Sequence, residues 1–304
     1  MNKPRIIIWF VSNDGRFIGG AINILTRQFN GVDIIGVTAA QQISIKDGAG
    51  KVLPFIPLNE ISMNGGYDII LVAGARNFGM SEVTKVAKSI GLDTEKLLGD
   101  WIACIPGFTL QKYRQLQRSQ LSIFSRDCFG GLISNTLGLS FRSPFVNLML
   151  SEKEWLKFLK VPHYYMEEKL TFKEKKFLEV FKHDYPEYFL GDIVLSMLHY
   201  PNFDEAVKKW YSRKNRINWY NLFVTMHTES QEILEQFDAL PYGKKVCFVP
   251  FKSKLSSAFY IDPNLKKDET FGRMTHLFAR GDYPAYYDMF DMLLYGKKTP
   301  LIKM

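Results

Sequence analysis

The sequence predicts an α/β protein of two domains, residues 1–110 and 111–304, the first with a mainly parallel sheet and the second with three layers, α/β/α. Three observations indicate this class. Short runs of β-branched and apolar residues alternate with segments of helical spacing, glycine-bearing turns separate them, and the alternation restarts near residue 110. Buried strands that alternate with helices are typical of parallel sheets covered on both faces. A chain of 304 residues has room for two such cores.

The first domain has a Rossmann-like strand–helix–strand rhythm. Its expected strands, each a short apolar run, are residues 5–11, 32–37 and 67–73. Helices are expected over residues 21–29 and 82–90, with a small hairpin at 48–53. Ser81 is placed to cap the second helix and Gly91 lies just past its end, where a left-handed residue commonly stops a helix.

The turn after the first strand does not carry a full dinucleotide-binding fingerprint. Such a turn needs closely spaced glycines so that the backbone can approach a pyrophosphate at a helix N-terminus. Aligning Asn13, Gly15 and Ile18 with the three glycines retains only the central one, although Gly19 and Gly20 follow. No acidic residue ends the second strand to hold a ribose. The sequence therefore argues against NAD and names no certain cofactor. Asn13, Gly15 and Gly19 remain candidate contacts for another small ligand. The alternative is that this domain binds no ligand.

The second domain repeats the alternation of strands and helices. Its expected strands are residues 121–125, 193–198, 221–226 and 245–249. Its expected helices are residues 131–137, 152–159, 173–181, 204–211 and 231–240. Acidic residues in the first turn favour the helix that begins at Asp204, and Ser230 is placed to cap the last helix.

Polar residues follow three of these strands. The first strand ends at Arg126, Asp127 and Cys128, and the next two end at His199 and His227. If the strands are parallel, these residues meet at one edge of the sheet. Cys128 could then be a nucleophile, and Asp127, His199 and His227 could transfer protons. The alternatives are a small buried thiol in a turn, an aspartate that binds the amides of the turn, and histidines with structural hydrogen bonds.

Further candidates could bind the anionic part of a substrate. Arg213 and Arg216 are three residues apart, so both are expected on one helix face, where paired guanidinium groups suit a phosphate or carboxylate. The alternative is a pair of cations that stabilises a helix C-terminus. The other candidate binding residues are Arg126, Gly130, Gly131, Arg142, Ser143, Asp192 and Asn218. No set of His, Cys, Asp and Glu has metal-ligand spacing.

The net charge of +8 is concentrated in the second domain. Residues 1–110 hold ten basic and nine acidic side chains, whereas residues 111–304 hold twenty-nine and twenty-two. This balance favours an anionic small molecule as partner and leaves peripheral contact with a membrane surface open. Because acids are interspersed among the bases, the pattern argues against nucleic acid. No apolar run reaches the ~20 residues of a membrane helix, and three widely spaced cysteines suit a reducing cytoplasm.

Several motifs of the second domain resemble landmarks of a bacterial family. They are the segment S-R-D-C-F-G-G from Ser125, then Leu137-Gly138-Leu139, Arg142-Ser143-Pro144, Leu190-Gly191-Asp192-Ile193, His199-Tyr200, Glu205-Ala206, and Trp210-x-x-Arg213-x-x-Arg216-Ile217-Asn218. The family carries a domain of unknown function and is commonly labelled exopolysaccharide biosynthesis protein. The resemblance spans roughly residues 112–300. Asp127 departs from it, since Asn is more frequent there.

This resemblance implies a bacterial surface-glycan context and no established reaction. The first domain is similar, more loosely, to degenerate Rossmann-like domains of surface-sugar biosynthetic proteins. One hypothesis is a transferase that acts on an activated, phosphate-containing sugar or acyl donor and a glycan precursor. Arg213 and Arg216 would hold the anionic part of the donor, and Asp127, His199 or His227 would deprotonate the acceptor. The alternative is a non-catalytic module that binds a nucleotide-sugar or docks on biosynthetic enzymes.

Overall fold

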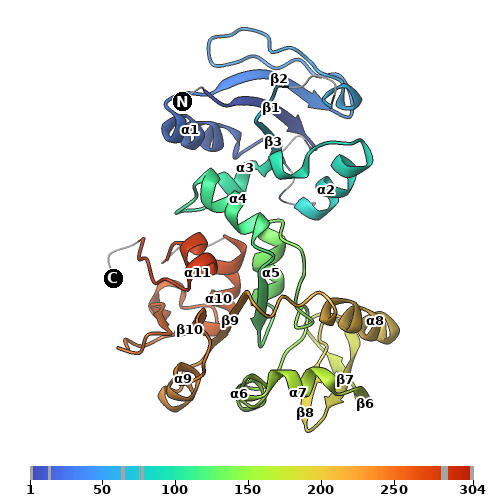
Figure 1. Ribbon diagram of the computed structural model, residues 1–304, viewed down its shortest axis with the longest axis vertical. Coiled ribbons are helices and arrows are strands. Elements are labelled where there is room, and N and C mark those ends of the chain that lie inside the picture. The colour runs from blue at the N-terminus through green and yellow to red at the C-terminus, as the bar shows by residue number, and fades with distance from the viewer. Residues whose placement is uncertain are drawn as a thin grey trace. The chain divides into compact units, whose positions relative to one another are not determined.

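The computed structural model describes residues 3–12, 15–62, 66–74, 76, 79–281 and 287–301. The chain divides into two compact units, each with its own sheet (Figure 1). Unit 1 comprises Met1–Arg118 and Asn135–Leu139, and unit 2 comprises Ser119–Ser134 and Ser140–Met304. Unit 1 extends beyond residue 110 because helix α4 (Leu110–Arg118) packs into it, with the buried Tyr113 hydroxyl donating to the Leu137 carbonyl at 3.1 Å.

Unit 1 is built on a four-stranded parallel sheet of order β2-β1-β3-β4, in agreement with the α/β class expected from the sequence. The strands are β1 (Arg5–Phe10), β2 (Asp33–Ala39), β3 (Ile69–Ala73) and β4 (Leu97–Gly99). The helices are α1 (Ile18–Phe29), α2 (Met80–Ser89), α3 (Asp100–Ala103) and α4, with 3-10 turns η1 (Leu58–Glu60) and η2 (Thr94–Lys96). Every residue of β3 is buried, as expected of an apolar run in the middle of a parallel sheet.

Three local expectations for unit 1 are corrected. Helix α2 begins at Met80 and has Gly79 at its N-cap without a side-chain bond, so Ser81 lies inside the helix and does not cap it. The expected hairpin is reduced to a turn closed by one isolated bridge between Lys46 and Val52. Gly19 lies in the first turn of α1 rather than in a loop. Gly91 follows α2 with a positive φ of 76°, as expected of a helix stop.

The larger sheet of unit 2 is also parallel, with order β11-β10-β9-β5. Its strands are β5 (Ser122–Ser125), β9 (Leu222–His227), β10 (Lys245–Val249) and β11 (Ala258–Tyr260). The helices of this unit are α5 (Phe129–Thr136, of which residues 129–134 belong to this unit), α6 (Glu152–Lys160), α7 (Pro162–Glu167), α8 (Phe203–Lys214), α9 (Gln231–Asp238), α10 (Phe271–Arg280) and α11 (Met289–Tyr295), with the 3-10 turn η3 (Pro263–Lys266). Ser230 caps α9 as expected, since its side chain accepts from the Ile233 amide.

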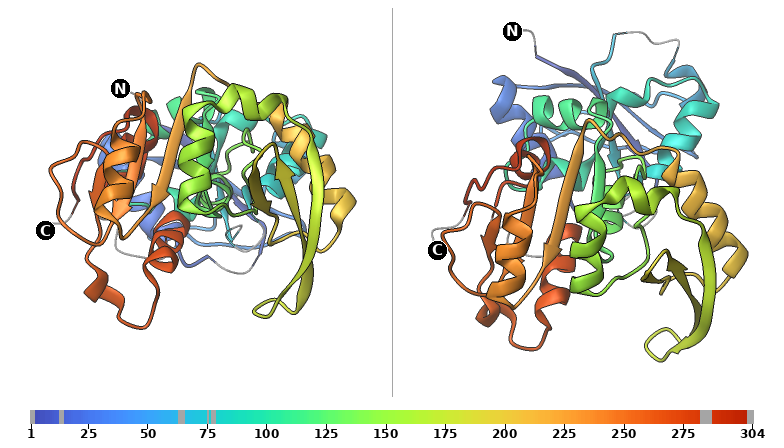
Figure 2. Two further views of the ribbon diagram at one scale, coloured as in Figure 1. Left: turned by 90° about the horizontal axis from the view of Figure 1, so that it is seen from below. Right: turned by 60° about the horizontal axis from the view of Figure 1, so that its bottom comes forward.

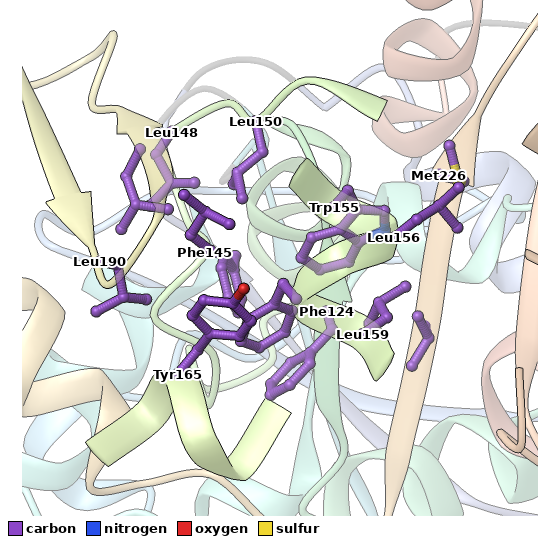
Figure 3. Packing of buried hydrophobic residues seen from close by; sticks show 14 of the residues in the cluster. Phe124, Phe145, Leu148, Leu150, Trp155, Leu156, Leu159, Tyr165, Leu190 and Met226 are labelled. Atoms are coloured by element: carbon purple, nitrogen blue, oxygen red, sulfur yellow. The ribbon is translucent and has the colours of Figure 1, made fainter. Parts of the chain in front are cut away.

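Alternate residues of these strands face two different helical layers. On one face, Phe124 and Met226 join Trp155 and Leu156 of α6 in the main hydrophobic cluster, part of which Figure 3 shows. On the other face, Phe248 contacts both Phe129 of α5 and Phe278 of α10, with ring centroids 5.2 and 5.7 Å apart. The sheet therefore lies between two layers of helices, as the predicted α/β/α arrangement requires.

A second sheet in unit 2 is antiparallel and overturns two expectations. It has the order β6-β7-β8, formed by β6 (Leu170–Leu178), β7 (His183–Leu190) and β8 (Ile193–Ser196). Residues 173–181 are therefore mostly strand and turn rather than helix, and residues 193–198 do not join the parallel sheet. Two lysines of this segment pair across the hairpin. Lys173 and Lys176 contact the buried carboxylate of Glu187 at 2.8 and 3.1 Å.

Figure 2 shows this long β6–β7 hairpin beside the other elements of unit 2. Within the residues that the structure describes, no helix is both long enough and apolar enough to span a membrane.

Candidate functional site

The carboxyl ends of β5 and β9 bring the segment Arg126-Asp127-Cys128 beside His227. The two strands are parallel neighbours, with Ser125 opposite Thr225. Each strand therefore releases its next residues at the same edge of the sheet, the position at which α/β proteins commonly bind ligands.

Asp127 is the centre of a hydrogen-bonded network at this edge. Its Oδ2 accepts from His227 Nδ1 at 2.9 Å, and its Oδ1 accepts from the Phe129 amide at 2.9 Å. His276 Nε2 is 3.6 Å from Oδ1, a distance at which the attraction is electrostatic rather than a hydrogen bond. Burial opposes ionisation of Asp127, but the hydrogen bond from His227 and the electrostatic attraction of His227 and His276 outweigh it and hold the pKa of Asp127 well below the usual range. Asp127 is therefore a buried carboxylate.

Arg126 fixes the tautomer of His227. Its Nη2 lies 2.7 Å from His227 Nε2, and a guanidinium group can only donate. His227 Nε2 must then accept, which leaves the ring proton on Nδ1, where it is donated to Asp127. Both ring nitrogens of His227 are thus occupied, so this histidine orients Asp127 rather than standing ready as a base. Among the described residues, Arg126 Nε has no hydrogen-bond partner.

Cys128 and His199 form a second pair next to this network. Cys128 Sγ lies 3.1 Å from His199 Nε2, a distance that suits transfer of the thiol proton. Burial and then the charge of Asp127 raise the pKa of Cys128 to about 12, while Arg280 opposes the increase. Burial, followed by the charges of His183, His276 and Arg280, lowers the pKa of His199. At neutral pH the pair is therefore a thiol facing a neutral imidazole.

His199 was expected at the end of a strand of the parallel sheet, but a different sheet positions it. It follows β8 of the antiparallel sheet, and its amide donates to the Asn147 carbonyl at 3.4 Å. The β6–β7 turn covers the imidazole. Phe181 of that turn meets the His199 ring edge-on at 5.0 Å and remains 54% exposed. The turn therefore forms one wall of the site and presents an open aromatic surface beside the Cys128–His199 pair.

One face of α10 completes the site, and the sequence interpretation missed it. Gly272, His276 and Arg280 are spaced four residues apart and therefore follow one another along the helix. A Cβ at Gly272 would lie 2.9 Å from His227 Nε2, so glycine is required for this close packing. His276 faces Asp127, and the charge of Arg280 acts on both Cys128 and His199. The only sequence signal was the i, i+4 spacing of these residues.

The two glycines predicted to bind substrate have structural roles in the α5 turn. The Gly130 amide donates to Ser125 Oγ at 2.9 Å, and a Cβ at Gly130 would lie 2.8 Å from that oxygen. A Cβ at Gly131 would approach Val146 Cγ1 to 3.0 Å. The Gly130 N–H is therefore occupied within the turn and is not a free donor for a substrate, and both glycines allow α5 to pack closely.

The predicted guanidinium pair does not lie on one helix face. Arg213 is 6% exposed and donates to the Tyr200 hydroxyl and, at 3.4 Å, to the Val146 carbonyl. Arg216 lies beyond the end of α8, which stops at Lys214, and is exposed. Burial and then the charges of Arg213 and Arg142 lower the pKa of Arg216, so the three guanidinium groups remain close enough to interact. Arg142 Nη1 donates to the Arg216 carbonyl at 3.4 Å.

The remaining candidates lie elsewhere or in structural contacts. The Asn218 amide donates to Ser122 Oγ at 2.8 Å, at the amino end of β5 and hence at the opposite edge of the sheet from Asp127. Ser143 is buried and accepts from the Phe145 amide, and Asp192 pairs with Lys157 and Tyr165. In unit 1, Gly15 precedes α1, and Asn13 lies outside the described residues. Among the described side chains, no group of three or more His, Cys, Asp and Glu could hold a metal ion.

The fold and this site define an α/β protein with a thiol–imidazole pair and a buried carboxylate at the carboxyl edge of a parallel sheet. Residues 104–296 match the family described as a domain of unknown function, DUF1919, and the chain belongs to this family. It is also similar to an uncharacterized protein of Haemophilus influenzae, with 32% identity over 188 residues that cover 60% of this chain and 86% of that protein. The family match contains Arg126 to Cys128, His199, His227 and α10.

Proposed function

We propose that this chain is a transferase of bacterial surface-polysaccharide biosynthesis that acts on an activated, phosphate-containing donor. Of the sugar and acyl donors that the sequence left open, the site geometry favours an acyl group. The observation that carries the proposal is the 3.1 Å distance between Cys128 Sγ and His199 Nε2. A thiol within hydrogen-bond reach of a neutral imidazole is an arrangement used for covalent acyl transfer.

In the proposed first step, His199 Nε2 accepts the thiol proton while Cys128 Sγ bonds to the acyl carbon. The bond between that carbon and the leaving group breaks, and the leaving group departs with the proton. In the second step, His199 accepts the proton of an acceptor hydroxyl, whose oxygen attacks the thioester carbon, and the departing sulfur recovers the proton. The pKa of about 12 for Cys128 requires proton transfer during attack, and the lowered pKa of His199 keeps its nitrogen free to accept.

The anionic part of the donor has two candidate positions. Arg280 is exposed at the end of α10, and its charge acts on both members of the reactive pair. Arg142 and Arg216, with the buried Arg213 behind them, form the alternative that the sequence suggested. We favour Arg280, because its cationic field acts directly on the atoms that would react. Phe181, half exposed beside His199, would support the ring of the sugar acceptor.

The proposed compartment is the cytoplasm. All three cysteines, Cys104, Cys128 and Cys247, are free thiols, as a reducing compartment favours. The surface-polysaccharide context rests on the sequence motifs that resemble proteins with that label.

A non-catalytic binding module is the second candidate. It is favoured by the high pKa of the Cys128 thiol and by the occupation of both nitrogens of His227. In that case the same residues would hold a donor without forming a covalent bond to it. Turnover, rather than affinity, separates the two candidates.

The test is covalent capture of an acyl group, followed by intact-mass and peptide mass spectrometry. The protein is incubated with acetyl-coenzyme A, which carries phosphates, and separately with p-nitrophenyl acetate, which carries none. We expect one acetyl group on Cys128 with both donors. His199→Ala should slow acylation by about 10²- to 10⁴-fold, as loss of a general base does. Arg280→Gln should slow the reaction with the coenzyme A thioester more than the reaction with p-nitrophenyl acetate, because only the former also loses a phosphate contact, and Arg216→Gln is its matched control.

Several outcomes contradict the proposal. Acetylation of Cys104 or Cys247 in place of Cys128, or equal rates in the parent and His199→Ala, would remove the reactive pair from the chemistry. Binding of the thioester without any adduct would favour the binding module. A defect in Arg216→Gln that exceeds that of Arg280→Gln would move the donor phosphate to the Arg142–Arg216 group.

A further inference from the structure

Unit 2 contains an aromatic pocket that the proposed reaction does not use. Its volume is about 360 Å³, and it is lined by Pro162, His163, Trp219, Tyr220, Leu222, Pro241, Tyr242, Gly243 and Lys244. Trp219 and Leu222 precede or begin β9, and Lys244 directly precedes β10. The pocket therefore lies at the amino edge of the parallel sheet. Since β9 has six residues at about 3.3 Å each, roughly 20 Å separates this edge from the edge that carries Asp127.

Contacts with neighbouring residues hold most aromatic rings of this pocket in place, and one ring is exposed to solvent. The His163 and Trp219 rings lie against each other with centroids 4.0 Å apart and planes tilted by 34°, and Phe124 of the core meets Trp219 in a T-shaped contact. The Tyr242 hydroxyl donates to the Leu159 carbonyl at 2.7 Å, which holds its ring in the wall. Tyr220, in contrast, is fully exposed at 102%. An aromatic side chain left wholly in water beside such a wall is available to cover a ligand.

One cation lies among these rings. The Lys244 ammonium donates to Asn221 Oδ1, and burial lowers its pKa. None of the nine lining residues is acidic, so no carboxylate within the pocket neutralises this charge. An ammonium ion that is partly removed from water and bonded to a neutral amide favours an anionic ligand group.

We infer that this pocket binds one acidic sugar residue of a glycan, a pyranose ring bearing a carboxylate or phosphate. The apolar face of the ring would lie on Tyr220 and the proline-lined wall, and its acidic group would meet Lys244. A flat nucleobase fits less well, because His163 already lies against Trp219, so a base could not stack between the rings of Trp219 and the exposed Tyr220. The volume lies at the lower end of the range for ligand pockets, which suits a single residue of a longer chain.

The inference is tested with the full chain by tryptophan fluorescence. Four of the five tryptophans are at most 5% exposed, whereas Trp219 is only partly buried, so a change in emission on ligand addition reports mainly on this pocket. D-Glucuronic acid should produce a saturable change. D-Glucose, which lacks the carboxylate, should bind about tenfold more weakly, and uridine monophosphate is the comparison for a base with a phosphate. Trp219→Phe should remove the signal.

Two variants and a control assign the contacts. Tyr220→Ala should weaken glucuronic acid binding about tenfold, in line with loss of one aromatic contact. Lys244→Gln should bind glucuronic acid and glucose equally. Tyr164→Ala is the matched control, because Tyr164 is 57% exposed and adjacent to His163 but does not line the pocket. Thermal unfolding of each variant confirms that it is folded.

Three results would overturn the inference: tighter binding of uridine monophosphate than of glucuronic acid, equal losses in Tyr164→Ala and Tyr220→Ala, or no saturable change together with no saturation transfer to glucuronic acid by NMR. Cys128→Ser should leave the binding unchanged. The pocket can therefore fail while the proposed acyl transfer stands, and the reverse also holds.

Discussion

The two edges of the parallel sheet in unit 2 share the same four strands and differ in chemistry. At the carboxyl edge, ionisable groups are buried against one another, with Asp127 held as a carboxylate between His227 and His276. At the amino edge, polar groups such as Asn218 bind backbone at strand ends, and aromatic rings line an open pocket. The residues that make this difference lie at the strand ends and in the connecting segments.

The two edges differ in how much their polar groups contribute to the stability of the fold. A buried carboxylate is tolerated only while its partners remain, because an unpaired charge in the interior costs several kcal/mol. Among the described residues of the amino edge, no such charge is buried around Asn218, which is half-buried and makes neutral hydrogen bonds of ordinary strength. Substitutions at the two edges should therefore have very different consequences.

The largest effect is expected from Asp127→Ala. This change removes the acceptor of the His227 Nδ1 proton and of the Phe129 amide, and it leaves His227 and His276 without their carboxylate. We expect a loss of about 3 kcal/mol in the free energy of unfolding, measured with urea. Asn218→Ala at the amino edge is the control and should lose about 1 kcal/mol. Equal losses would show that the two edges do not differ in this way.

A somewhat smaller effect is expected where α10 meets the carboxyl edge. In Gly272→Ala the new Cβ would lie 2.9 Å from His227 Nε2, so the ring must move away from Arg126. Such overpacking should cost about 2 kcal/mol by urea unfolding. Gly243→Ala, at the amino edge, is the matched control, because nothing lies within 4 Å of the added Cβ and its φ is not in the left-handed range. Its stability should change by no more than ~1 kcal/mol.

Much of the parallel architecture could be predicted from the sequence, because buried parallel strands are short apolar runs between turn residues. The runs that became β5, β9 and β10 are of this kind. The β6–β7 hairpin could not be recognised in this way. Residues 173–181 mix charged and apolar residues as an amphipathic helix does, but Glu187 and Asp184, the partners of Lys173 and Lys175, lie on the opposite strand. A local pattern does not reveal a cross-strand partner.

The sequence also predicted only some residues of the candidate site. The sequence placed Asp127, Cys128 and His227 at strand ends, where parallel pairing brings them together. His199 also reaches the site, although its strand belongs to the antiparallel sheet. His276 and Arg280 were missed because α10 carries no strand-end signal. Their position depends on how a distant helix packs over Phe129 and Phe248, which only the tertiary fold determines.

The smallest of these effects is expected on the reactivity of Cys128. The rate at which this thiol is alkylated reports on the charges around it at the carboxyl edge. The charge of Asp127 raises the pKa of the thiol and that of Arg280 lowers it, both in addition to burial. Asp127→Asn should therefore lower the pKa of Cys128, increase the thiolate fraction at pH 8, and speed alkylation by iodoacetamide about tenfold for each unit of pKa. Arg280→Gln should slow it. The rates are followed peptide by peptide, so that fully buried Cys247 is the internal control in every sample. A rate that rises in both variants would mean that the thiol responds to loosened packing rather than to charge, and the carboxyl edge would then differ from the amino edge in burial alone.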